Sequence, residues 1–248
     1  MSRLASVPTR SSGHDGVFIP PRPGGGDGGG GEGKPDRTPN YGLRLRHARL
    51  GLAVAMAPIV TLFLTFSIVY LLRRSYVSFD PLQKAYVRDW LPLQLPWLLL
   101  FANTAILIFS SGTIEFARRA ITREAALAPV RSIPGVSLGR ESRFPWLSLT
   151  TVLGFLFLAG QLDVWRNFSA RGFHMTGGTS SSFVYVLTAM HGVHLAGGVV
   201  ALISANFAAL LRRSIDSRRI VVDVASWYWH CMTVLWLYIL VMFSIAAK

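Results

Sequence analysis

Two histidines lie in the middle of an apolar stretch that is long enough to cross a lipid bilayer. His191 and His194 are three residues apart within residues 180–200, so a helix would turn both imidazoles to one face. Imidazoles at this spacing can share a metal ion or a haem iron, and ionisable side chains at this depth are usually functional or bound to a protein partner. Gly197 and Gly198 favour close packing of helices. The stretch therefore predicts a transmembrane helix that is buried among other helices and carries functional or partner-binding histidine side chains.

A metal site would need at least one more ligand, and the nearest candidate by residue type is His230. Counted from the inner ends of the apolar runs, His230 lies about five residues deep and His194 about seventeen. At 1.5 Å per residue these depths differ by roughly 15 Å, whereas metal–nitrogen bonds are about 2 Å long. We therefore expect no catalytic residue and no metal, haem or other cofactor on this chain. The histidines are expected to form hydrogen bonds between helices.

Other polar residues of the apolar runs also fit structural roles. Asn103 and Thr104 fall near mid-membrane, where hydroxyls and amides bond across helices or to their own carbonyls. Trp229 should open the last helix at the membrane interface, as part of an aromatic belt, while Trp236 lies deeper. The full set of such positions comprises Asn103, Thr104, Ser110, Ser111, Thr113, Gln161, Trp229 and Trp236.

Two acidic residues lie near the ends of the apolar runs. Glu115 precedes Arg118 and Arg119 by three and four residues, which predicts ordinary ion pairs along one helix. Asp163 is similarly placed to pair with Arg166. A proton-related role for Asp163 or Glu115 is the alternative.

The composition indicates an integral membrane protein. Of the 248 residues, 51% are hydrophobic, and the mean hydropathy is +0.41. The net charge of +13 comes from basic residues in short clusters beside apolar runs, which is typical of cytoplasmic loops and argues against a nucleic-acid partner. The single cysteine, Cys231, excludes an internal disulfide.

The order of apolar and polar segments predicts an all-α, five-helix membrane bundle. Residues 1–40 lack apolar periodicity, and eight of the ten residues 24–33 are glycine, so we expect a disordered tail. Pro58, and Pro92 with Pro96 near the start of the second run, should kink or begin helices without ending the spans. The membrane domain, residues 41–248, has five apolar runs near the required length of about 20 residues, at about 50–72, 91–117, 144–165, 182–211 and 225–247.

The charges beside these runs predict the orientation of the chain. With five spans, 14 Lys and Arg side chains flank the runs on the side of the N-terminus, against 7 on the opposite side. Cytoplasmic flanks carry the excess of basic residues. We therefore expect the N-terminus in the cytoplasm and the C-terminus outside.

Several motifs together resemble those of haem-copper oxidase subunit III, the third core subunit of cytochrome c and quinol oxidases. The stretch from Ser181-Ser182 through His191-Gly192-Val193-His194 to Gly197-Gly198 is similar to that family's Ser-Ser…His-Gly-x-His…Gly signature. The other matches follow the family's order: Asn103-Thr104 with Ser110-Ser111-Gly112-Thr113, then Phe157 to Gln161, then Asp223 and Tyr228-Trp229-His230 with Trp236. The resemblance covers roughly residues 49–247.

Two positions depart from the family pattern. The family usually carries a membrane-embedded acid on the first of these helices, and alignment on Phe63 and Tyr70 places Ile59 there, beside Pro58. The acid of the last motif is replaced by Thr233. Both losses argue against a carboxylate-dependent role at these positions and indicate a divergent branch.

The resemblance implies a non-catalytic subunit of a bacterial terminal oxidase in aerobic respiration. Such a chain would be inactive alone, pack with subunits I and II, which hold the haem and copper, bind phospholipids and support proton uptake. It would be a multi-pass protein of the bacterial inner membrane. An accessory subunit of a nitric oxide reductase system shares the same signatures. A small transporter is a third possibility, but inverted repeats or broken helices, which are typical of transporters, are not visible in the sequence.

Overall fold

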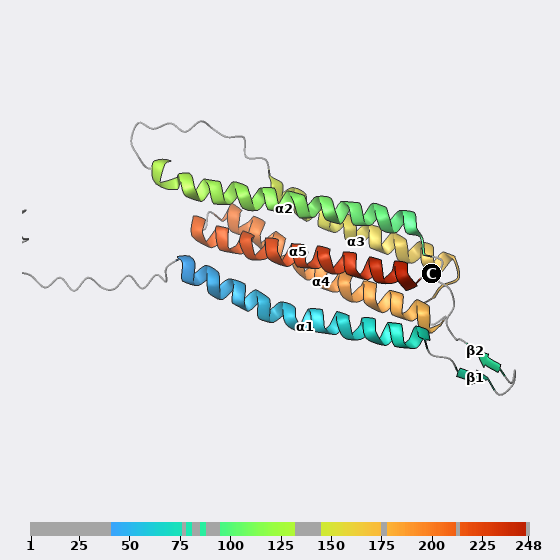
Figure 1. Cartoon of the computed structure of the whole chain (residues 1–248). Coiled ribbons are helices and arrows are strands. Elements are labelled where there is room, and N and C mark those ends of the chain that lie inside the picture. Colours follow the sequence, from blue (N-terminus) through green and yellow to red (C-terminus); the bar gives the residue numbers. More distant parts are fainter. Residues whose placement is uncertain are drawn as a thin grey trace, which may run out of the picture. The chain divides into compact units, whose positions relative to one another are not determined.

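The computed structural model describes residues 41–75, 78–80, 85–87, 95–131, 145–174, 178–211 and 214–246. The predicted tail, residues 1–40, lies outside the described residues. Within them the elements are α1 (Tyr41–Ser75), β1 (Ser78–Asp80), β2 (Ala85–Val87), α2 (Trp97–Arg131), α3 (Trp146–Ala170), α4 (Thr179–Leu210) and α5 (Ile215–Ala246) (Figure 1).

In the described part of the chain, five helices are long and apolar enough to span a membrane, which confirms the predicted fold class. The sequence did not predict β1 and β2, which pair antiparallel with Phe79 opposite Tyr86. Pro58 lies inside α1 without ending it. Pro96 directly precedes α2, where its carbonyl accepts a hydrogen bond from the Leu100 amide (3.1 Å). A proline just before a helix lacks only an N–H that would have no helical partner.

Several helices are longer than the apolar runs that predicted them. The difference that matters for the site is in α5, which begins at Ile215 and not near residue 225. Its first turns carry Arg218, Arg219 and Asp223, and these charges end an apolar run although they do not end a helix. This extension changes the depth at which the polar side chains of α5 lie.

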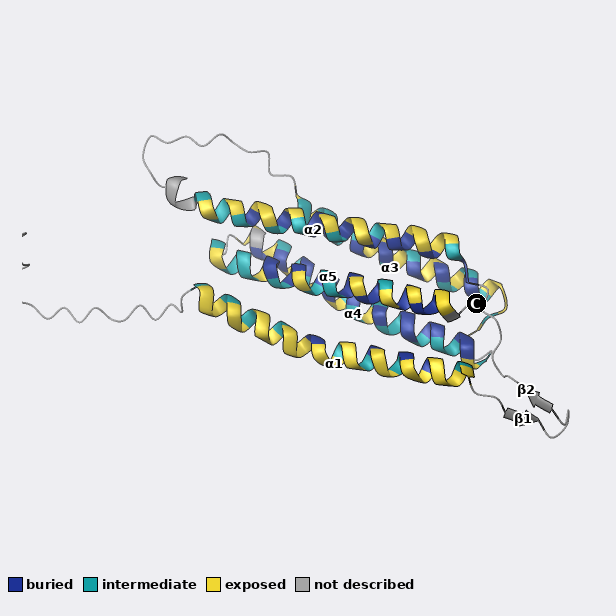
Figure 2. Cartoon of the chain, viewed as in Figure 1, coloured by how far each residue is buried: buried dark blue, intermediate teal, exposed yellow. Residues whose placement is uncertain are grey.

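Helix α5 lies at the centre of the bundle and packs against α1, α2 and α4, while α3 packs against α2 and α4 (Figure 1). Helix α1 is the most peripheral, and Figure 2 shows most of its surface exposed. Its buried side is a narrow stripe of Met56, Phe63, Ser67 and Tyr70. This spacing of three, four and seven residues is that of one helix face.

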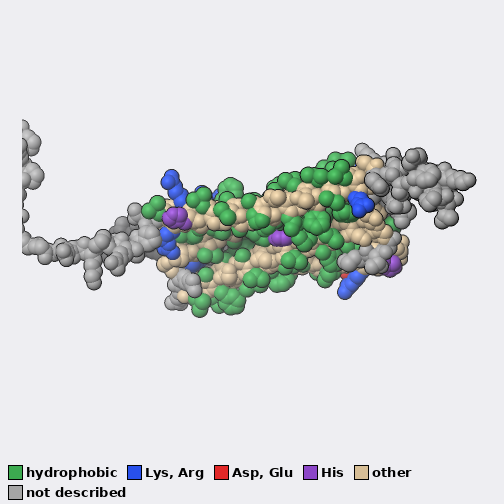
Figure 3. Space-filling model, turned by 90° about the horizontal axis from the view of Figure 1, so that it is seen from below, with side chains coloured by type: hydrophobic (Ala, Val, Ile, Leu, Met, Phe, Trp, Pro, Cys, Tyr) green, Lys and Arg blue, Asp and Glu red, His purple; other side chains and the backbone are tan. Residues whose placement is uncertain are grey.

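The core is rich in aromatic side chains, including the fully buried Trp229, Trp236 and Phe157. Large apolar side chains such as Phe101, Phe109 and Phe116 are exposed on the outer face of α2, as expected where lipid replaces water. In the view of Figure 3, hydrophobic side chains cover the middle of the bundle, and Lys and Arg side chains lie near its two ends.

Two glycines allow α3 and α4 to approach the aromatic side chains of α5. A Cβ atom at Gly198 would lie 2.9 Å from the Tyr228 ring, and one at Gly154 would lie 2.8 Å from the Trp229 ring. Both distances are too short for a methyl group, so any larger residue would push the helices apart. These contacts fix the height of α5 relative to α3 and α4.

Candidate functional site

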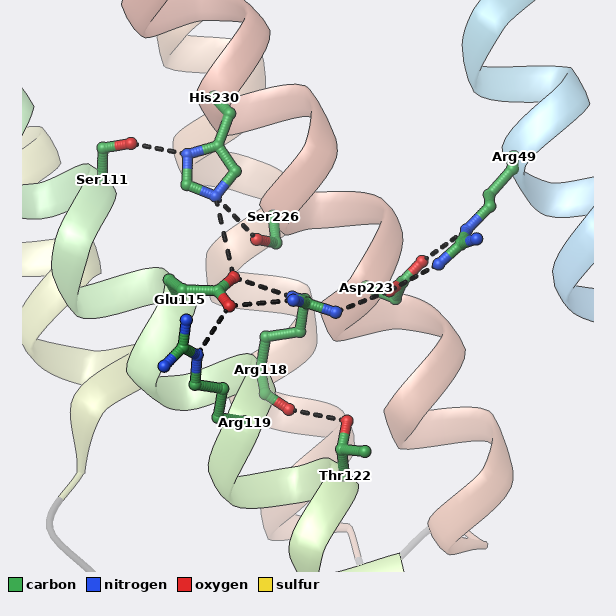
Figure 4. A network of polar contacts seen from close by, with 9 residues as sticks. All are labelled: Arg49, Ser111, Glu115, Arg118, Arg119, Thr122, Asp223, Ser226 and His230. Atoms are coloured by element: carbon green, nitrogen blue, oxygen red, sulfur yellow. Dashed lines mark hydrogen bonds and ion pairs between the residues drawn. The ribbon is translucent and has the colours of Figure 1, made fainter.

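An ionic cluster joins three helices near the N-terminal end of α1 (Figure 4). Its first part is the predicted set of ion pairs along α2, which the structure confirms. Nε and Nη2 of Arg118 donate to the two carboxylate oxygens of Glu115 at 2.8 Å, and Arg119 Nε donates to the same carboxylate at 2.8 Å. The Glu115 carboxylate is therefore neutralised by its own helix.

Asp223 extends this cluster across the bundle, and its arginine partners were not predicted from the sequence. Arg49 of α1 donates to its two carboxylate oxygens at 2.9 and 3.0 Å, and Arg118 of α2 lies 3.7 Å away. The Asp223 side chain is only 8% exposed, whereas that of Arg49 is 46% exposed. A buried carboxylate on α5 thus binds one arginine from each of two other helices. Because Arg49 and Asp223 are 174 residues apart, no local pattern connects them.

His230 lies at the edge of the same cluster. Its Nδ1 is 2.6 Å from the Ser111 hydroxyl, its Nε2 is 3.2 Å from the Ser226 hydroxyl, and Nε2 lies 4.0 Å from Glu115 (Figure 4). These contacts confirm the predicted bond between helices for His230 and place Ser111 in the site.

The predicted difference in depth between His230 and His194 is wrong. Because α5 begins ten residues before the expected position, near residue 215, its histidine lies deeper than the apolar run indicated. Tyr228, two residues before His230, donates its hydroxyl to the His194 carbonyl at 2.8 Å. His194 therefore lies near the level of His230, whereas His191 packs on Trp236, six residues further along α5, and His230 faces α2.

His191 and His194 do not converge, and within the described residues neither side chain forms the expected hydrogen bond to another helix. His194 Nδ1 contacts the carbonyl of Met190 on its own helix at 2.7 Å, and its ring lies 5.8 Å from that of Phe63 on α1. The His191 ring is fully buried between Phe157 of α3 and Trp236 of α5, with ring centroids 5.9 and 5.1 Å away. Side chains three residues apart on a helix point in somewhat different directions about its axis, so the two rings can contact different helices.

Indole donors cross the bundle at two levels. Trp236 Nε1 donates to Thr104 Oγ1, and Trp229 Nε1 donates to Ser110 Oγ, both at 2.9 Å. Trp229 is fully buried, so its predicted place in an interfacial belt is wrong, because the helix begins well before it. Trp236 forms the expected bond within the bundle.

Further polar contacts join α2 to α3. The hydroxyls of Thr113 and Thr150 are 2.9 Å apart, and the Asn103 amide points toward Gln161 at 3.5 Å. Both contacts are buried. The sequence indicated the polar positions Asn103, Thr113 and Gln161 but not the partner Thr150.

The remaining predicted positions lie outside the cluster. Asp163 pairs with Arg166 at 3.1 Å, and both side chains are largely exposed. Ile59 is half-buried and packs against the core one turn before Phe63, while the Thr233 hydroxyl donates to the Trp229 carbonyl at 3.0 Å. Among the described residues, no three His, Cys, Asp or Glu side chains gather in a way that would hold a metal ion.

The sequence matches a known protein family over most of its length. Residues 50–247 match the family model described as cytochrome c oxidase subunit III. Cytochrome c oxidase subunit 3 of Struthio camelus is 30% identical over 148 residues, which are 60% of this chain and 49% of that protein. The subunit 3 of Prototheca wickerhamii is 26% identical over 59% of this chain and 49% of that protein.

A bacterial relative is also similar. The probable cytochrome c oxidase subunit 3 of Mycobacterium tuberculosis is 27% identical over 37% of this chain and 45% of that protein. The chain spans about half the length of the curated relatives it matches. The matched region contains all five membrane helices apart from the first turns of α1. With its five spans and its motifs on α2 to α5, the chain belongs to the cytochrome c oxidase subunit III family.

Proposed function

We propose that this chain is the non-catalytic third core subunit of a bacterial terminal oxidase, located in the inner membrane and packed against subunits I and II. The observation that carries the proposal is the family match over residues 50–247, which spans the helical bundle apart from the first turns of α1. The chemistry of the bundle supports it. The polar side chains named above mostly bind one another or backbone carbonyls. On this proposal the haem and copper belong to the partner subunits.

The test is purification of the tagged chain in mild detergent. We expect a haem-containing catalytic subunit to copurify and the preparation to consume oxygen, while the chain expressed alone is colourless and inactive. A complex that forms but reduces nitric oxide instead of oxygen would favour the nitric oxide reductase alternative. Purification without any haem protein would remove both.

We further propose that the subunit prolongs the activity of the oxidase without changing its haem environment. The buried polar contacts hold the bundle together and leave its outer apolar side chains free to meet lipid or another subunit. Deletion of the chain should reduce the number of turnovers that the oxidase completes before inactivation and leave its haem absorption spectrum unchanged. A shifted spectrum would place this chain closer to the reaction centre than proposed.

A groove between α1, α4 and α5 supports the proposal that the chain binds phospholipid. The groove measures about 530 Å³ and is lined by apolar or small residues that include Leu52, Gly197, Ala201 and Val224. It lies beside the arginine-rich end of α1, where Ala48 precedes Arg49. An acyl chain in the groove would place an anionic headgroup near these cations.

Filling the groove tests the lipid proposal. Ala201→Leu should lower the phospholipid that copurifies with the complex, whereas the control Val200→Leu, at an exposed position on the same helix, should not. Equal lipid content in the two variants would argue against a site in this groove.

The orientation is proposed from the charges, with the N-terminus in the cytoplasm. Cysteine introduced at Ser169, at the end of α3, should react with a membrane-impermeant reagent added to whole cells. Cysteine at Ser217, at the start of α5, should be protected. The opposite labelling pattern would reverse the orientation.

A further inference from the structure

We propose that the bundle binds one or more ordered water molecules between α2, α3 and α4, at the level of His191. The starting observation is the imidazole itself. His191 is fully buried, and neither ring nitrogen has a hydrogen-bond partner among the described residues. A neutral imidazole carries one donor and one acceptor, and a buried polar group that is left unpaired destabilises a protein.

Two further polar groups without a complete set of partners belong to the neighbouring helices. Asn103 Oδ1 on α2 and Gln161 Nε2 on α3 are buried and have no partner in the described part of the chain. Their one mutual contact, from Asn103 Nδ2 to Gln161 Oε1, is 3.5 Å long, beyond the usual range for such bonds. Exchanging the oxygen and nitrogen of both amides would again leave one donor and one acceptor unpaired.

The packing of the antiparallel helices brings these groups to one level. Between α3 and α4, Trp165 bonds Thr188 (3.0 Å) and Gly154 lies against Val199, so Gln161 falls opposite His191 and Gly192. In two antiparallel helices, one residue number rises as the facing residue number falls, so the two facing pairs locate the residues that lie opposite Gln161.

The same reasoning places Asn103 at this level. Between α2 and α3, Thr113 faces Thr150 and Asn103 faces Gly160 and Gln161. A Cβ atom at Gly160 would lie 2.5 Å from Asn103 Oδ1, so the amide is packed directly against the α3 backbone. Three helices therefore present unpaired polar atoms toward one layer of the core.

The chemistry of this layer fits water. It offers an acceptor from Asn103, a donor from Gln161 and one of each from His191, and a water molecule can both donate and accept. Buried waters typically make about three hydrogen bonds to otherwise unpaired groups. Phe157 and Trp236 contact the imidazole and provide apolar walls, so no partner for His191 comes from their side.

Solid-state NMR on the full chain, in its complex and in lipid bilayers, tests the proposal with water as the probe. In ¹⁵N-histidine-labelled protein, magnetisation should pass from water to the His191 ring nitrogens several-fold faster than to the buried Leu195 methyl groups one turn away. The His191→Phe variant assigns the signal by its loss. Transfer as slow as that to Leu195, or a direct bond from His191 to Gln161 or Asn103, would overturn the proposal.

Variants of the amides test whether the water is shared. Gln161→Leu removes one partner and should slow transfer to His191 by at least half. The matched control is Thr113→Val, which removes another buried polar group between the same two helices and should leave the transfer unchanged. Equal transfer in both variants would overturn a shared site, and the wild-type measurement decides the matter if Gln161→Leu does not fold.

Discussion

Replacing Arg49 by glutamine should destabilise the bundle, although almost half of the arginine side chain is exposed. Arg49 provides the two shortest contacts of the Asp223 carboxylate, at 2.9 and 3.0 Å. Without it the carboxylate keeps Arg118 at 3.7 Å, which is too long for a good hydrogen bond. The substitution therefore leaves a buried negative charge with poor solvation.

The expected loss is about 2–3 kcal/mol in the free energy of unfolding. Hydrogen bonds to charged groups contribute roughly 1.5–3 kcal/mol each, and the exposed side of Arg49 requires a discount, because water can replace part of the interaction. The reciprocal variant Asp223→Asn should lose less, about 1–2 kcal/mol, since Arg49 can turn to water and Arg118 keeps Glu115.

The chain offers a matched control in its second Arg–Asp pair. Arg166 and Asp163 are 80% and 64% exposed, so Arg166→Gln should change the stability by no more than about 0.5 kcal/mol. The assay is unfolding of the purified chain by SDS in mixed micelles, followed by tryptophan fluorescence. Equal losses for Arg49→Gln and Arg166→Gln would refute the argument from burial. A fully additive Arg49→Gln/Asp223→Asn double variant would show that the two side chains do not interact.

Four further substitutions test the packing and the family comparison. Gly198→Ala should destabilise by about 1–3 kcal/mol through a clash with an aromatic ring, whereas Gly192→Ala, which meets nothing within 4 Å, should be neutral or stabilising in the same SDS assay. Trp229→Phe should lose about 1 kcal/mol with its bond to Ser110, and an unchanged SDS midpoint would contradict that role. Ile59→Glu should create a site on α1 that a hydrophobic carbodiimide modifies, because the position is half-buried among apolar side chains. If peptide mapping finds the new glutamate unreactive, residue 59 does not correspond to the family's embedded acid.

The sequence alone was enough to predict the five spans and the ion pairs of Glu115. Both features are local. A span needs about 20 apolar residues, because a helix satisfies all of its own backbone groups within the hydrocarbon. The Glu115 pairs follow from the helical period, which brings residues three and four apart together. For the same reason, the sequence could identify Asn103, Gln161 and His191 as buried polar positions.

Only the tertiary structure decided which of these side chains meet. Asp223 and Arg49 come together because α1 packs along α5, and His230 joins Glu115 because of how far α5 is rotated about its axis. The start of α5 at Ile215 was hidden, since charged residues end an apolar run but continue a helix where it leaves the hydrocarbon. Depth and rotation of a helix are set by packing against its neighbours, here through glycine-to-aromatic contacts such as that of Gly198. No pattern within a single helix records them.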